Sequence, residues 1–270
     1  MILRIGRSAG RVLSMIWSYR EVLTAVTRVE LAKRYSGSAF GKAWLLINPM
    51  LLLSIYLFVY LVVFKVRFPG FSEFDYTLYV FAGLVPYIGM SEALNSGAVS
   101  LRQNMHLVKN VMLPVDLIPV RTVFVALAGQ VVSILIVALL VLGDENMNWR
   151  FLLLPVVIVL QVLFLLGCVF VLSAVVVALP DVANFVNLTL LLLMFISPIG
   201  FTPEMVPGGF QAMIYLNPVY YMTEAFRSVL LANHPINLEA LGWYAVICVV
   251  TFALGSAFFR RFKNMLVDYE

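Results

Sequence analysis

Residues able to do covalent or metal chemistry are few in this chain and lie far apart. The two histidines, His106 and His234, both fall in predicted loops. The two cysteines, Cys168 and Cys248, lie within long apolar runs, where a packing role is favoured. No group of His, Cys, Asp and Glu residues has the spacing of metal ligands. The residue types therefore indicate a chain that is not an enzyme and that holds no metal.

Residues 37–42 superficially look like a phosphate-binding loop. That motif, G-x-x-x-x-G-K-[ST], needs four residues between its glycines and a hydroxyl after the lysine. Here three residues separate Gly37 from Gly41, and Ala43 follows Lys42. We therefore expect a turn at the two glycines and no nucleotide cofactor in this chain.

Aromatic side chains are the strongest candidates for contact with a substrate. The chain has 20 Phe, 12 Tyr and 4 Trp, and tyrosine combines an apolar ring with a hydroxyl that forms hydrogen bonds. This combination suits an amphiphilic sugar better than an ion. The candidates for a pore wall are Tyr56, Tyr60, Tyr79, Phe81, Tyr87 and Phe195. For each of them, packing or a place in the interfacial aromatic belt is the alternative.

The composition identifies the elements that must position these residues. The chain has 270 residues, of which 63% are hydrophobic and 12% are charged, and its mean hydropathy is +0.99. Soluble domains carry about 25% charged residues. The balance excludes a soluble enzyme, a disordered tail and a secreted disulfide scaffold. It predicts an all-α, polytopic membrane protein with residues 1–270 as one transmembrane domain.

Charge-free stretches predict six transmembrane helices, since a span needs about 20 apolar residues. They are 43–64, 76–91 extending through 98, 122–143, 151–180, 182–203 and 240–259. Residues 205–223 are also free of charge but contain two prolines and two adjacent glycines. Because lipid cannot replace the interrupted backbone hydrogen bonds, we predict a re-entrant or interfacial hairpin there.

The placement of the basic residues predicts the orientation. With six spans, 14 of the 18 Lys and Arg residues fall on one side: eight in 1–42, three in 92–121 and three after 259. The positive-inside rule then places both termini in the cytoplasm. Apart from Glu92, the spans contain no Asp, Glu, Lys or Arg. An ion relay is therefore not expected, and energy must come from another subunit or a passive gradient.

Residues 1–42 form the longest basic segment. Arg4, Arg7 and Arg11 have helical spacing, which is typical of a helix lying on anionic headgroups; a disordered start is the alternative. Further on, Glu30 and Arg34 form an i,i+4 pair in the favourable order. Residues 20–42 fit an amphipathic lead-in to the membrane or a docking element equally well.

A second segment on the same side, residues 101–113, has the pattern of an amphipathic helix. Leu101, Met105, Val108 and Met112 define one helical face, and Arg102, His106 and Lys109 form a neighbouring basic stripe. Such a helix either docks into a groove of a partner or rests on the membrane.

In order along the chain, these segments resemble the membrane subunit of bacterial ABC exporters for polysaccharides, the ABC-2 permeases for O-antigen, capsule or teichoic acid. The resemblance covers nearly the whole chain. It is carried by residues 28–35 and 38–44 with Pro49, by Asn104 with residues 107–109 and 113–114, and by residues 197–199 and 216–218 with Glu224 and Arg227. The turn after the fourth span has Pro180-Asp181, where the family often has Arg-Asp.

The resemblance implies partners for this chain and a role for each segment. The partners would be a second copy of the chain, two copies of a cytoplasmic subunit that binds ATP and Mg, membrane lipids and a lipid-linked polysaccharide, with no nucleic acid. The location would be the bacterial inner membrane.

It also implies four groups of site residues. A helix coupling to the ATPase would use Leu101, Arg102, Met105, His106, Val108, Lys109 and Met112. An interfacial helix beside it would include Arg28, Glu30, Lys33, Arg34 and Tyr35. The polysaccharide channel would be lined by Tyr56, Tyr60, Tyr79, Tyr87 and Phe195. The external gate at 205–223 would involve Pro198, Asn217, Pro218, Glu224 and Arg227.

Three other functions stay open at this point. The same architecture serves ABC-2 exporters of drugs or small lipids. An ATP-independent channel or scaffold belongs to a different class. A membrane glycosyltransferase is a more distant alternative, because the sequence has no acidic nucleotide-sugar motif.

Overall fold

The computed structural model describes residues 2–63, 72–104, 114–143 and 149–268, which contain ten α-helices and no strand. The predicted all-α membrane fold is confirmed. The helices are α1 (Ile2–Ser18), α2 (Arg20–Tyr35), α3 (Trp44–Leu57), α4 (Glu73–Gln103), α6 (Leu117–Gly143), α7 (Leu154–Ala178), α8 (Val182–Ile196), α9 (Gly208–Tyr215), α10 (Pro218–Leu230) and α11 (Leu238–Asp268).

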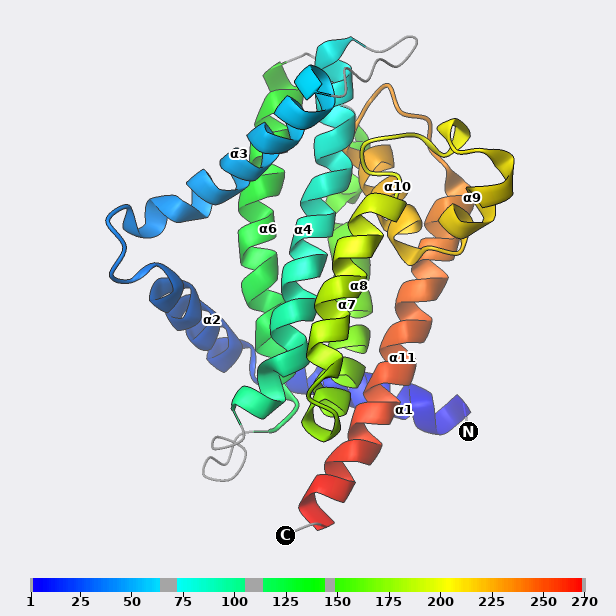
Figure 1. Cartoon of the computed structure of the whole chain (residues 1–270). Helices are drawn as coiled ribbons and strands as arrows, with labels where there is room; N and C mark the ends of the chain where they lie inside the picture. Colours follow the sequence, from blue (N-terminus) through cyan, green and yellow to red (C-terminus); the bar gives the residue numbers. More distant parts are fainter. Residues whose placement is uncertain (1, 64–71, 105–113, 144–148, 269–270) are drawn as a thin grey trace.

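Helix α4 lies at the centre of the bundle. It packs against α6, α7, α8 and α10, and α7 in turn packs along α11 (Figure 1). Helices α1 and α2 lie across the end of the bundle at which both termini are found, and α9 and α10 lie toward the opposite end (Figure 1). The first two helices and both termini therefore lie at the same end of the bundle.

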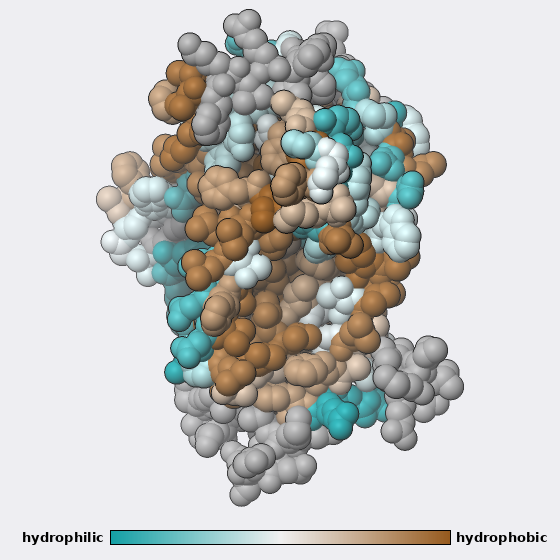
Figure 2. All heavy atoms as spheres, turned by 45° about the vertical axis from the view of Figure 1, so that its right-hand side comes forward, coloured by the Kyte–Doolittle hydropathy of each residue, from teal (hydrophilic) through white to brown (hydrophobic). Residues whose placement is uncertain are grey.

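Five helices in the described part of the chain are long and apolar enough to cross a membrane. They are Trp44–Val63, Glu73–Gln103, Leu117–Leu142, Trp149–Ala178 and Leu238–Lys263. Figure 2 shows apolar residues gathered over the middle of one face and more polar residues toward its ends. This pattern fits a protein surrounded by lipid.

The fifth predicted span, 182–203, is shorter as a helix than expected. Helix α8 ends at Ile196, and Ser197 is extended, with φ −76° and ψ 143°. Pro198 explains this ending, because proline has no N–H to donate and forces the preceding residue out of the helical region.

The second span is longer as a helix than predicted. It begins at Glu73, where Ser72 and Asp75 form a capping box, and runs to Gln103.

The first span is the least buried. It consists of α3 and a π-helical turn, Phe58–Val63. Only 6% of its most apolar stretch of 18 residues is buried inside the protein. In Figure 1, α3 leans away from the bundle at the end near α2. Between α2 and α3, Gly37 and Gly41 have φ values of +84° and +49°, which confirms the predicted turn.

Candidate functional site

Arg227 of α10 is the centre of a buried polar cluster. Its side chain is 0% exposed, and Nη2 donates to the carbonyl oxygens of Pro198 and Ile199, both at 2.8 Å. Its Nε donates to the carbonyl of Tyr79 on α4 at 3.3 Å, and the guanidinium lies 3.6 Å from the centre of the Tyr79 ring. One side chain thus ties α10 to α4 and to the segment that follows α8.

Glu224 supplies the negative charge of this cluster. Its Oε1 accepts from Arg227 Nη1 at 3.1 Å, and its Oε2 lies 2.9 Å from His234 Nε2. The carbonyl of His234 accepts from Arg150 Nη1 at 2.9 Å, which extends the cluster to the turn before α7. We call Tyr79, Arg150, Glu224, Arg227 and His234 the arginine cluster.

Asn217 connects the segment at 216–218 with the segment at 197–199, next to this cluster. Its Oδ1 accepts from the Val219 N–H at 3.0 Å and caps α10, while Pro218 occupies the first turn, where no N–H is needed. Its Nδ2 donates to Ser197 Oγ at 2.8 Å. The motifs at 197–199 and 216–218 are therefore in direct contact.

The charge state of Glu224 links the cluster to pH. Burial would raise the pKa of this carboxyl, but the hydrogen bond from His234 and the charge of Arg227 outweigh burial and hold the pKa below its usual 4.5. Because the folded pKa is lowered, ionised Glu224 stabilises the fold above the unfolded pKa. This contribution is lost as the pH falls through the folded value.

We expect acidification from about pH 6 to about pH 4 to lower the thermal unfolding temperature of the purified protein, in part through Glu224. Glu224→Gln should unfold earlier than wild type at the higher pH and show a smaller decline. Glu239→Gln, at an exposed position on α11, is the control. If acidification lowered the unfolding temperature of Glu224→Gln as much as that of wild type, the role assigned to this carboxylate would be contradicted.

A second group, which we call the tyrosine seam, consists of Tyr56, Tyr60, Tyr76 and Tyr87. Tyr56 and Tyr60 stack with ring centres 6.2 Å apart, and Tyr60 meets the edge of Tyr76 at 6.4 Å. The Tyr76 hydroxyl donates to the Gly200 carbonyl at 2.9 Å, and the Tyr87 hydroxyl donates to the Leu190 carbonyl. The seam joins α3 and α4 to α8 and the residues after it.

Only part of the predicted channel set lies in this seam. Tyr56 and Tyr60 are half-buried and Tyr87 is buried, whereas Tyr79 belongs to the arginine cluster and Phe195 is 69% exposed. Within this chain the five residues do not form one surface. Tyr76 completes the seam and was missed by sequence reasoning, because nothing in its local pattern distinguishes it from a packing aromatic.

The predicted external gate residues come together more closely. The carbonyl of Pro198 and the side chains of Asn217, Glu224 and Arg227 all belong to one network, and Pro218 begins the helix that carries two of them. Sequence reasoning missed His234 and the contact made by Gly83. A Cβ at Gly83 would lie 2.8 Å from Arg227 Nη2, so the guanidinium needs the absence of a side chain there.

The predicted interfacial helix is α2, and it is tied to the bundle by charge. Arg34 forms an ion pair with Glu92 of α4, which gives the one acidic residue of the predicted spans a partner. Glu30, Lys33 and Arg34 line a polar cavity of about 360 Å³ together with Asn104 and Arg121. Arg28 lines a different cavity, between α2 and α6, and Tyr35 ends the helix.

The predicted coupling helix is only partly described. Leu101 and Arg102 belong to the last turn of α4 rather than to a separate helix, and Leu101 is buried in the core. The prediction that a new helix begins at 101 is therefore wrong, because the capping and apolar packing of α4 carry it through Gln103. Met105, His106, Val108, Lys109 and Met112 lie outside the described residues.

Comparison with known proteins gives a consistent family. The profile of ABC-2 type transporters matches residues 21–231. The chain is 27% identical over 263 residues to the O-antigen export system permease protein RfbA of Myxococcus xanthus, covering 96% of this chain and 98% of that protein. It is 26% and 25% identical over 251 residues to two Klebsiella pneumoniae proteins of the same name, covering 92% of this chain and 94% of each. Since the profile spans most of its length, the chain belongs to the ABC-2 type transporter family.

Proposed function

We propose that this chain is the membrane-spanning subunit of an ATP-driven exporter that moves a lipid-linked polysaccharide of the O-antigen type across the bacterial inner membrane. The observation that carries this proposal is the similarity, over 92–96% of the chain, to permeases named for O-antigen export. The structure adds a tyrosine-rich seam, which suits a carbohydrate substrate.

The proposed complex contains two copies of this chain and two copies of an ATP-binding subunit. The sequence has no phosphate-binding loop of its own, so hydrolysis would take place on the partner. Both termini and the basic helices α1 and α2 lie at one end of the bundle, which would face the cytoplasm. The predicted contact of residues 101–113 with the ATP-binding subunit would exclude Leu101, which is buried in the core.

A second copy of the chain would complete the channel. Most of the apolar surface of helix α3 is exposed. Tyr56 and Tyr60 are half-buried where the first span contacts α8. Aromatic ring faces can stack on sugar rings while the tyrosine hydroxyls form hydrogen bonds. Two such seams facing each other would give a conduit for a polymer without any covalent step on the substrate.

The arginine cluster divides the external segment into a fixed and a movable part. Arg227 holds α10 and residues 198–199 against α4. Within the described part of the chain, helix α9 is held only at its end, where the Tyr221 hydroxyl of α10 donates to the Tyr215 carbonyl at 2.8 Å, and most of its residues are exposed. In the proposed exporter, α9 would be the element that gates the external mouth.

The test is export by Tyr56→Ala and Tyr60→Ala variants. Loss of an aromatic stacking surface worth about 1.5 kcal/mol would lower export by about tenfold. Surface polymer is measured by immunoblot of intact cells, and ATPase activity by phosphate release from the purified complex. Phe58→Ala is the matched control, because Phe58 lies in the same π-helical turn as Tyr60 and is 58% exposed.

We expect both tyrosine variants to assemble with the ATP-binding subunit and to hydrolyse ATP at the wild-type rate. Unchanged polymer export would refute the channel assignment, and loss of drug extrusion alone would favour the drug-exporter alternative. A permease that purifies without an ATP-binding subunit and conducts on its own would overturn the proposal as a whole.

A further inference from the structure

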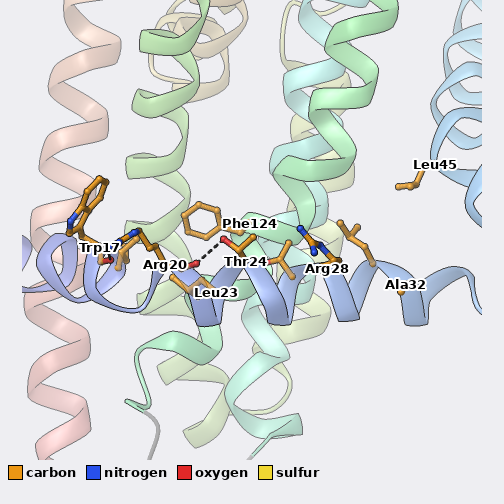
Figure 3. A pocket seen from close by; sticks show the side chains of 11 residues that line it. Trp17, Arg20, Leu23, Thr24, Arg28, Ala32, Leu45 and Phe124 are labelled. Atoms are coloured by element: carbon orange, nitrogen blue, oxygen red, sulfur yellow. Dashed lines mark hydrogen bonds between the residues drawn. The ribbon is translucent and has the colours of Figure 1, made fainter.

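A cavity of about 570 Å³ lies between α2 and the helix bundle. Its volume falls within the range of about 300–1,000 Å³ typical of small-molecule sites. Most of its wall is apolar and comes from four elements, with Ile16, Leu23, Leu31, Leu45 and Phe124 as the main contributors. Figure 3 shows Arg20, Leu23 and Thr24 of α2 near Phe124 of α6, with Arg28 further along α2 and Leu45 of α3 at one side.

The polar part of the wall comes from α2 and is positively charged. Arg20 and Arg28 line the cavity with Thr24 and Thr27, and none of the described residues that line it is acidic. Among the described residues, the Arg28 guanidinium has no hydrogen-bond or ion-pair partner. The Thr27 hydroxyl is buried and also has no hydrogen-bond partner there. Arg28 is exposed, so the Thr27 hydroxyl is the buried group that lacks a partner, and Arg28 supplies an accessible positive charge beside it. A cation and an unpaired hydroxyl beside an apolar wall fit an anionic ligand with a hydrocarbon portion.

Arg20 donates one hydrogen bond, from Nη1 to the Trp17 carbonyl oxygen at 3.1 Å, and its other contacts are weak. Its guanidinium lies 5.0 Å from the centre of the Trp17 ring, and its ion pair with Glu21 is 3.9 Å long. Both partners of that pair are mostly exposed, so solvent screens their attraction. Arg20 and Arg28 are eight residues apart on one helix, which puts them about 12 Å apart along its axis and about 80° apart around it. Both nevertheless line the cavity.

The position of the cavity matches the boundary between headgroups and hydrocarbon. Helix α2 lies across the end of the bundle, at the predicted cytoplasmic surface. Phe124 is seven residues into α6, about 10 Å along the helix from its start at Leu117. The cavity therefore extends from the level of the arginines toward the interior of the membrane.

We propose that this cavity binds one anionic phospholipid of the leaflet nearest the termini. Its phosphate would lie between Arg20 and Arg28 and accept from the Thr27 hydroxyl, and an acyl chain would lie against Leu45 and Phe124. The lipid would fasten α2 and the start of α3 to α6. The site is separate from the tyrosine seam, because Tyr56, the seam residue on α3, lies about three helical turns from Leu45. This separation favours a structural membrane lipid over the transported lipid-linked substrate.

The test uses native mass spectrometry of the full permease purified with its ATP-binding subunit. The probe is palmitoyl-oleoyl phosphatidylglycerol, with phosphatidylcholine as the neutral comparison. We expect one phosphatidylglycerol per permease chain and about tenfold weaker binding in Arg28→Gln, from the loss of a charged hydrogen bond. Arg11→Gln removes an exposed arginine of α1 outside the cavity and should bind as wild type does.

A second variant keeps the charge and fills the space. Ala32→Trp places a large side chain into the cavity wall and should also weaken phosphatidylglycerol binding, while leaving elution volume and helical content unchanged. Equal binding by wild type and both cavity variants would overturn the proposal. So would absence of bound phosphatidylglycerol in the complex, as expected if a second copy covers the cavity. Displacement of the lipid by a polyprenyl phosphate would assign the site to the substrate and overturn it as well.

Discussion

Replacing Arg227 with methionine should destabilise the protein by about 3–5 kcal/mol, the range for removing one partner of a buried ion pair. The carbonyls of Tyr79, Pro198 and Ile199 would lose their donor in a buried part of the bundle. Glu224 would keep its bond to His234 but lose its cationic partner. Export should be lost, because α10 and the segment after α8 are no longer held to α4.

Thermal unfolding of the purified permease measures this effect, which should lower the unfolding temperature by roughly 10 °C. Arg260→Met is the control, since Arg260 is exposed on α11. Arg227→Lys should fall between wild type and Arg227→Met, because an ammonium keeps the charge but lacks the planar fork that reaches several acceptors. Near-identical unfolding of the Arg227→Met and Arg260→Met variants would show that the cluster does not hold these elements together.

Replacing Gly255 with leucine should separate α7 from α11 and destabilise the protein by about 3 kcal/mol. A Cβ at Gly255 would lie 2.2 Å from the Gly167 carbonyl oxygen, and a Cβ at Gly167 would lie 2.4 Å from the Thr251 carbonyl oxygen. Both obstacles are backbone atoms, which cannot rotate away as a side chain could. Small residues permit such close approach of membrane helices.

Gly242→Leu provides the matched control, because Gly242 is on the same helix and a Cβ there would meet no atom of the described residues within 4 Å. It adds the same side chain with the same change in helix propensity. Both variants are compared with wild type by thermal unfolding in detergent. If Gly242→Leu and Gly255→Leu unfold at the same temperature, the backbone contact does not limit how α7 and α11 pack.

The helices of the membrane domain could be predicted from sequence because their signal is length and apolarity. Residues 122–143 and 240–259 fall within α6 and α11. The ends of the helices are less predictable where a proline or a buried contact, rather than apolarity, decides where the helix stops. The end of α8 depends on Pro198, and the continuation of α4 through Leu101 depends on burial in the core.

The contacts of the candidate site could not be predicted in the same way. Tyr79 and Arg227 are 148 residues apart, and no periodicity relates them. The aromatic pattern therefore predicts a channel position for Tyr79, whereas its carbonyl and ring contact Arg227. The grouping of Pro198, Asn217, Glu224 and Arg227 came from the family resemblance rather than from spacing. Gly167 and Gly255 gave no signal, because a glycine in an apolar run also fits simple packing.

The exposure of the first span affects how the protein responds to the thickness of its membrane. Its 20 residues, Trp44–Val63, are about 30 Å long, which equals the hydrocarbon thickness only if the helix stands upright. Helix α3 instead leans away from the bundle and has little buried surface to hold its tilt. Hydrophobic mismatch therefore acts on α3 first: a thicker bilayer draws it upright and a thinner one lets it lean further. Because Leu45 near the start of α3 lines the cavity beside α2, such a change of tilt would also change the shape of that cavity.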